Sequence, residues 1–71
     1  MNEQEYKIYG WFAARDQNEI IHVFQVKPRK IVDEGRWWDR DYMSIEISKD
    51  AFPKLTWHDE PIEVELTIKK I

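Results

Sequence analysis

Apolar residues recur at every second position along most of this chain, which is the pattern of a β-strand with one buried face. The clearest example is residues 62–69, where aliphatic and polar side chains alternate directly after Pro61. A similar alternation, with aromatic residues on both faces, covers residues 6–13, and Gly10 within it is typical of a β-bulge. The pattern therefore predicts two long strands separated by a more broken middle section.

The middle section predicts shorter strands joined by turns. Asp and Asn in residues 16–19 favour a turn, because their side chains bond to their own backbone. The apolar run at 20–26 then completes a hairpin, and its β-branched residues predict a strand central in the sheet. The remaining expected elements are a strand beginning at Ile31, a turn at 33–35, a return through 36–39, a strand at 43–48 and one short helical turn near 49–53, capped by Ser48 and ended by Pro53.

These elements predict an all-β fold built from about five short antiparallel strands. The chain has 71 residues, so one small domain covering 1–71 is expected, since a chain of this size buries only roughly 60% of its unfolded surface. Four Trp, three Tyr and three Phe distinguish it from disordered chains. We expect a small antiparallel barrel or curled sheet, SH3-like or OB-like in shape, with the helical turn near 49–53.

The composition argues against several kinds of chemistry. There is no cysteine, so disulfides, zinc–thiolate sites and cysteine nucleophiles are excluded. The two histidines, His22 and His58, lack the spacing of a metal site, and two glycines cannot build a phosphate-binding loop. We therefore predict a protein that is not an enzyme, with no catalytic residues, no bound metal and no cofactor.

The polarity of the chain predicts a cytoplasmic protein without membrane association. The longest apolar run is residues 11–14, far short of a membrane span, and residues 1–5 are polar and acidic, unlike a signal peptide.

Charge is distributed unevenly along the chain. The net charge is −3, but residues 27–40 carry five basic and three acidic side chains, while residues 41–65 carry two basic and seven acidic ones. Adjacent residues of a strand point to opposite faces, so one of Trp37 and Trp38 is expected to lie in the core and the other to face solvent. Tryptophan and arginine are enriched among the residues that dominate protein interfaces. The candidate binding residues are Lys27, Arg29, Arg36, Trp37, Trp38 and Arg40.

The leading hypothesis is a protein-interaction module that binds a protein partner or a second copy of itself through these residues. The alternative is binding of single-stranded nucleic acid through segment 27–40, in which Lys27, Arg29 and Lys30 contact phosphates and the tryptophans stack on bases. The sequence pI of about 5.3 makes nucleic acid the less favoured partner. A third hypothesis is an inhibitor whose acidic face, 41–65, imitates DNA.

A set of short motifs resembles a group of short hypothetical proteins from phages and prophages. The motifs are Ala14-Arg15-Asp16, Val23-Phe24, Lys27-Pro28-Arg29, a tryptophan near 37–38, and the segment 52–66, in which Phe52-Pro53, Thr56-Trp57 and Asp59-Glu60-Pro61 are the most specific parts. Glu19 stands where the group commonly has glycine, which leaves the type of the first turn open. The resemblance implies a small cytosolic accessory protein of a mobile element, and no activity or functional residue is carried over.

Overall fold

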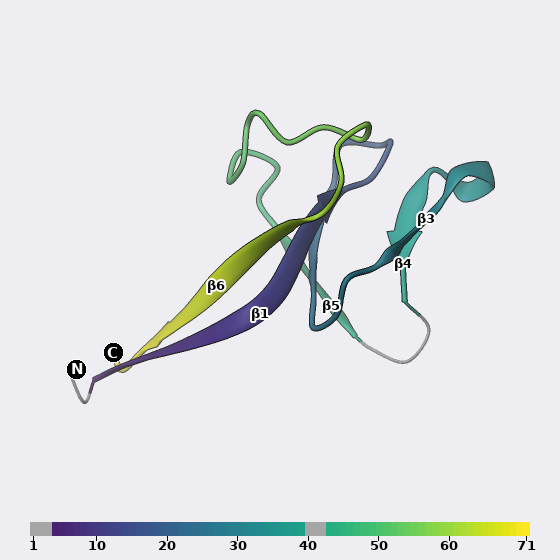
Figure 1. Cartoon of the computed structure of the whole chain (residues 1–71). Helices are drawn as coiled ribbons and strands as arrows, with labels where there is room; N and C mark the ends of the chain where they lie inside the picture. Colours follow the sequence, from purple (N-terminus) through teal and green to yellow (C-terminus); the bar gives the residue numbers. More distant parts are fainter. Residues whose placement is uncertain (1–3, 40–42) are drawn as a thin grey trace.

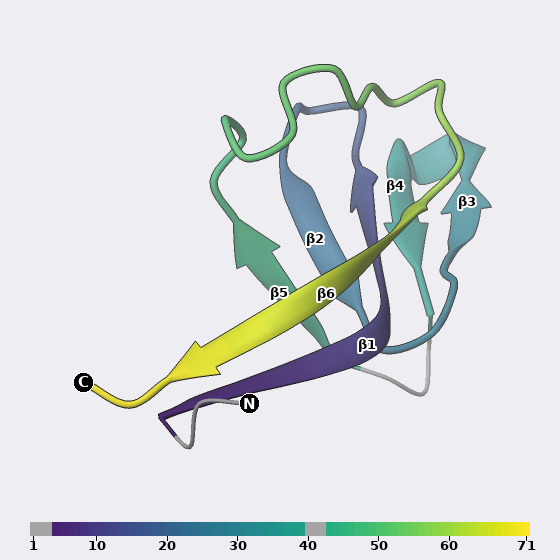
Figure 2. The same ribbon diagram turned by 60° about the vertical axis from the view of Figure 1, so that its left-hand side comes forward.

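The computed structural model describes residues 4–39 and 43–71. Its elements in chain order are β1 (Glu5–Arg15), β2 (Ile21–Phe24), β3 (Arg29–Ile31), the 3-10 helix η1 (Val32–Glu34), β4 (Arg36–Trp38), β5 (Ser44–Ile47) and β6 (Ile62–Lys69). Two antiparallel sheets result, as Figures 1 and 2 show. One is four-stranded in the order β5-β2-β1-β6, and the other is the hairpin β3-β4.

The all-β prediction is confirmed, with a curled open sheet in place of a closed barrel among the described residues. Figure 2 shows β1 bending along its length. β2 lies between β5 and β1, so the prediction of a central second strand is also confirmed. The described part of the chain has six strands, since the strand expected to break near residue 33 forms two, β3 and β4.

The bend of β1 coincides with the bulge predicted at Gly10. The pairing of β1 with β6 shifts by one residue between Ile8 and Trp11, and Gly10 has φ +85°, a conformation that side chains with a Cβ rarely adopt. Beyond the bulge, the outer parts of β1 and β6 project from the body of the molecule as a two-stranded ribbon (Figures 1 and 2).

The four-stranded sheet has a core on each face, because neighbouring residues of β1 point in opposite directions. Ala13 packs with Ile21, Val23 and Leu55 on one face, supported by half-buried side chains that include Trp11, Phe52 and Val64. Ala14 packs with Phe24 and Trp37 on the other face, against which Trp57 also lies. The loop 48–61 thus covers the first face with Phe52 and Leu55, and the β3–β4 hairpin covers the second together with Trp57 of the same loop.

The short helix is at η1, not near 49–53 as expected. Residues 49–53 form turns, in which the Ser48 hydroxyl accepts from the N–H of Asp50 and the Ser48 carbonyl accepts from Ala51. The Lys49 carbonyl finds no α-helical donor because Pro53 lacks an N–H, and it accepts from the Arg15 guanidinium. The Phe52 carbonyl accepts both from the N–H of Leu55 and from Arg15. Contacts with a residue more than thirty positions away therefore stabilise turns where the local sequence favours a helix.

Candidate binding site

Arg15, at the end of β1, joins three segments of the chain. Its side chain is buried, and its guanidinium donates to the carbonyls of Glu19, Lys49, Phe52 and Leu55. A guanidinium carries five N–H donors in a fixed plane, so one side chain can hold several loop carbonyls at once. Arg15 therefore fixes the 48–61 loop and the β1–β2 turn against the end of the sheet.

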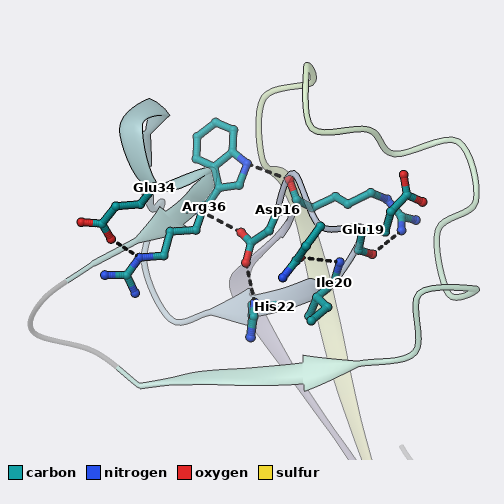
Figure 3. Close-up of polar contacts among 9 residues, drawn as sticks. Asp16, Glu19, Ile20, His22, Glu34 and Arg36 are labelled. Carbon is teal, nitrogen blue, oxygen red and sulfur yellow. Dashed lines mark hydrogen bonds and ion pairs between the residues drawn. The ribbon is translucent and has the colours of Figure 1, made fainter.

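Asp16 performs the corresponding role for the β3–β4 hairpin (Figure 3). Its buried carboxylate accepts from the backbone N–H of Trp37 at 2.9 Å, and its other oxygen lies 3.4 Å from Nδ1 of His22. The Trp37 indole N–H donates to the Arg15 carbonyl at 3.0 Å. Two hydrogen bonds thus attach β4 to the end of β1 and fix which side of the hairpin faces the sheet.

The register of the hairpin divides its side chains into two sets. Arg29 pairs with Trp38, Lys30 with Trp37, and Ile31 with Arg36. Paired residues of antiparallel strands lie on the same face. One face therefore holds Lys30 and Trp37, and the opposite face, called here the arginine–tryptophan face, consists of Arg29, Ile31, Arg36 and Trp38.

The face that holds Lys30 and Trp37 is occupied by the fold itself. The rings of Trp37 and Trp57 meet edge-on, with centroids 6.1 Å apart. The Lys30 ammonium lies 4.2 Å from the centroid of Trp57 and 5.5 Å from that of Trp37, a cation–π arrangement with both rings. Trp37 is only 6% exposed, so it is the inward member of the tryptophan pair.

The arginine–tryptophan face is more open to solvent. Arg29 and Arg36 are exposed, and Ile31 and Trp38 are half-buried. The Arg36 guanidinium lies 6.0 Å from the ring centroid of Trp38 and also pairs with Glu34, as Figure 3 shows for the labelled pair. Both side chains of that ion pair are exposed, so the pair contributes little to stability and Arg36 can exchange Glu34 for another partner.

The six candidate residues from the sequence are thus separated by the structure. Arg29, Arg36 and Trp38 lie together on one face, whereas Trp37 belongs to the core. Lys27 is exposed in the β2–β3 connection. Arg40 lies outside the described residues.

A hollow of about 380 Å³ borders this face, between β4 and the β2–β5 pair. Arg36 and Trp38 line one side of it, and His22 and Ser44 contribute from the paired strands. Asp16 and Phe24 also line the hollow, and the ring of His22 lies 6.2 Å from that of Phe24. The hollow therefore combines aromatic walls with a carboxylate, an imidazole and a guanidinium.

The sequence pattern indicates no site role for Asp16 or His22. Asp16 was expected to bond to its own turn, but Asn18 performs that function by accepting from the N–H of Ile20. The available signal was an Arg-Asp pair directly after the two small residues Ala13 and Ala14, because a charged pair adjoining a core strand needs buried partners. The partners lie far along the chain, on β4 for Asp16 and mainly in the 48–61 loop for Arg15.

Neither a metal cluster nor a membrane helix is found in the part of the chain that the structure describes. Within residues 4–39 and 43–71, no group of three His, Cys, Asp or Glu side chains is arranged to hold a metal ion. The same ranges contain no helix long and apolar enough to cross a membrane.

Comparison with known proteins found no matching family model, no similar curated protein and no similar solved structure.

Proposed function

We propose that this protein is a non-enzymatic interaction module that binds an acidic protein segment through its arginine–tryptophan face. The observation that carries the proposal is the hairpin register, which puts Arg29, Arg36 and Trp38 on the face turned away from the Trp37 contact. An accessory role in a phage or other mobile element accords with the sequence resemblance and remains a prediction.

The chemistry of this face suits a partner that combines carboxylates with an apolar or aromatic side chain. Arginine donates planar, paired hydrogen bonds to carboxylates, and a partly exposed indole supplies apolar contact at low cost in side-chain entropy. Arg36 already bonds Glu34 within the chain, so the geometry of a carboxylate pair is available there. A partner carboxylate can replace Glu34 while its apolar neighbour covers the Trp38 ring.

Single-stranded nucleic acid is the second candidate, because Trp38 flanked by Arg29 and Arg36 also resembles a stacking ring beside phosphate contacts. The observations that weigh against it concern the rest of segment 27–40. Trp37 is buried, and Lys30 lies over Trp37 and Trp57. One ring and two arginines form a smaller platform than strand-binding grooves use, since those stack successive bases.

The test is a fluorescence-anisotropy titration of a labelled peptide rich in Asp, Glu and Tyr, with a labelled oligothymidylate as the second probe. Trp38→Ala and Arg36→Glu should each weaken peptide binding by at least about tenfold, as expected for interface anchors. Lys54→Glu is the matched control, because Lys54 is exposed in the 48–61 loop and the change in charge is the same. Circular dichroism verifies that each variant is folded.

Peptide binding that is equally weakened by Lys54→Glu would indicate unspecific attraction to any basic side chain and would overturn the proposal. Peptide binding unchanged in Trp38→Ala and Arg36→Glu would place the site elsewhere. If the oligothymidylate alone binds, with an affinity that falls steeply with salt and depends on Trp38, the nucleic-acid alternative is correct.

A further inference from the structure

Strand β6 forms one edge of the four-stranded sheet, and in the described residues its outer side has no neighbouring strand. It is eight residues long and contains no proline, and the bulge in its pairing belongs to β1. Natural edge strands are usually short, bulged or interrupted by proline, because a long regular edge readily pairs with another strand. The opposite edge, β5, is only four residues long. β6 is therefore the better edge for pairing.

The ribbon formed by β1 and β6 also exposes apolar surface. Tyr6 pairs with Ile68 and Ile8 with Leu66, so these four side chains form a row on one face. Tyr6 and Ile68 are 62% and 57% exposed. A two-stranded ribbon is marginally stable in water by itself, and further strands beside it stabilise it.

The backbone of β6 is oriented so that alternate residues present their hydrogen-bonding groups at the free edge. The N–H of Lys70 donates to the carbonyl of Gln4 at 2.8 Å, so Lys70 directs its backbone toward β1. In an antiparallel strand, the backbone N–H and C=O groups of successive residues point to alternate sides of the strand. Even-numbered residues of β6 therefore face β1, and the odd-numbered ones offer N–H and C=O groups outward. The outward residues are Glu63, Glu65, Thr67 and Lys69.

These four residues make the edge complementary to itself. In an antiparallel pair of β6 strands centred on Leu66, Glu63 lies opposite Lys69 of the second copy, and Glu65 lies opposite its Thr67. Both pairs join odd-numbered residues, so their outward backbone groups meet. On the other face, Val64 lies opposite Ile68 of the second copy, which continues the apolar row across the boundary.

The neighbouring registers are less favourable. A pair centred on Glu65 places two glutamates directly opposite each other, which is repulsive. A pair centred on Thr67 also brings unlike charges together, with Glu65 opposite Lys69 of the second copy, but it leaves residues 62–64 of each strand without a partner inside β6. The Leu66-centred register keeps residues 63–69 of both strands paired and puts unlike charges together.

We propose that a second copy of this chain binds along β6, antiparallel and centred on Leu66, to form a two-fold dimer with one continuous eight-stranded sheet. In this dimer each Lys69 lies between Glu5 of its own chain and Glu63 of the other copy. The two-fold axis repeats this contact, so one charge change alters two pairs. The proposal is independent of the arginine–tryptophan face, which lies on the separate β3–β4 sheet.

The test is sedimentation equilibrium of the full chain from about 1 µM to about 1 mM, a range that covers weak to moderate dimers. The unaltered chain should show a concentration-dependent dimer. Glu63→Lys and Lys69→Glu should each raise the dimer dissociation constant by at least about tenfold, because each puts like charges opposite in two places. An equimolar mixture of these two variants should dimerise again, since every Lys then meets a Glu. Glu60→Lys is the control for net charge, because Glu60 is exposed outside β6.

If the chain is a monomer at every concentration, the proposal is overturned, and the β6 edge is then free to pair with a strand of another protein. A dimer that tolerates both charge changes, or a mixture that fails to dimerise while each variant is folded by circular dichroism, also overturns it. None of these outcomes depends on peptide binding at Trp38, so the dimer and the proposed function are tested separately.

Discussion

Arg15 and Asp16 are neighbours in sequence, yet each organises a different part of the molecule. Arg15 holds the carbonyls of the 48–61 loop, and Asp16 holds the backbone of Trp37. In the described residues no buried side-chain nitrogen or oxygen is without a hydrogen-bond partner. Hydrogen bonds therefore offset the free-energy cost of burying the charges of Arg15 and Asp16. The positions of the 48–61 loop and of the β3–β4 hairpin depend on these two side chains.

The first turn contains the one residue other than glycine that has positive φ among the described residues. Glu19 has φ +79°, and glycine is the residue that adopts this conformation without strain. Its side chain is exposed, while its carbonyl accepts from Arg15. The conformation, and not the glutamate side chain, is therefore what the turn requires.

We predict that Glu19→Gly raises the free energy of unfolding by about 1 kcal/mol, since it removes the strain of a left-handed residue. The melting temperature should rise by about 5 °C in a domain of this size. Gln17→Gly in the same turn is the control and should lower the melting temperature, because Gln17 has no positive φ to relieve. Equal behaviour of the two variants would contradict the explanation.

Among the elements, the alternation of apolar and polar residues predicts the strands well, but it does not predict the structure of every segment that connects them. The two long strands and the hairpin across residues 16–19 follow from local pattern, because side-chain alternation is itself local. The helical turn expected near 49–53 is replaced by turns whose Lys49 and Phe52 carbonyls accept from Arg15. No local pattern contains that contact.

The candidate site, too, depends on contacts between residues that are distant in the sequence. Alternation correctly indicated that Trp37 and Trp38 lie on opposite faces, but their order depends on Asp16 and Trp57, which are distant in sequence. The grouping of Arg29 with Trp38 likewise depends on the hairpin register, set by η1 and by Gly35 with φ +66°.

The β3–β4 hairpin should behave as a unit that is attached to the end of β1 by Asp16, by the Trp37 indole and by the N–H of Gln17, which donates to the Gly35 carbonyl. We predict that in Asp16→Ala the amides of β3 and β4 exchange with deuterium at least about tenfold faster, because the bond to Trp37 is lost and local opening becomes easier. Amides of the β1–β2 pair should change much less. Asp33→Ala, on exposed η1, is the control, and uniform acceleration in both sheets would contradict the separate attachment.

At the scale of the whole molecule, the chain is less compact than its length suggests. Its radius of gyration is 13.0 Å, whereas a compact chain of 71 residues has about 11 Å. The extents of 44 × 27 × 17 Å are in keeping with the projecting β1–β6 ribbon. The ribbon adds an edge suited to self-pairing, and the hairpin adds the arginine–tryptophan face.

We propose that the β3–β4 hairpin has one face that holds the fold together and one face that binds a partner. Parallel urea denaturation of Trp37→Ala and Trp38→Ala distinguishes the two faces. Trp37→Ala should lose about 3 kcal/mol or more, as buried tryptophans do, and so leave little of a small domain's stability. Trp38→Ala should lose less than about half of that and stay folded. An equal loss in the two variants, or a larger loss for Trp38→Ala, would contradict the account.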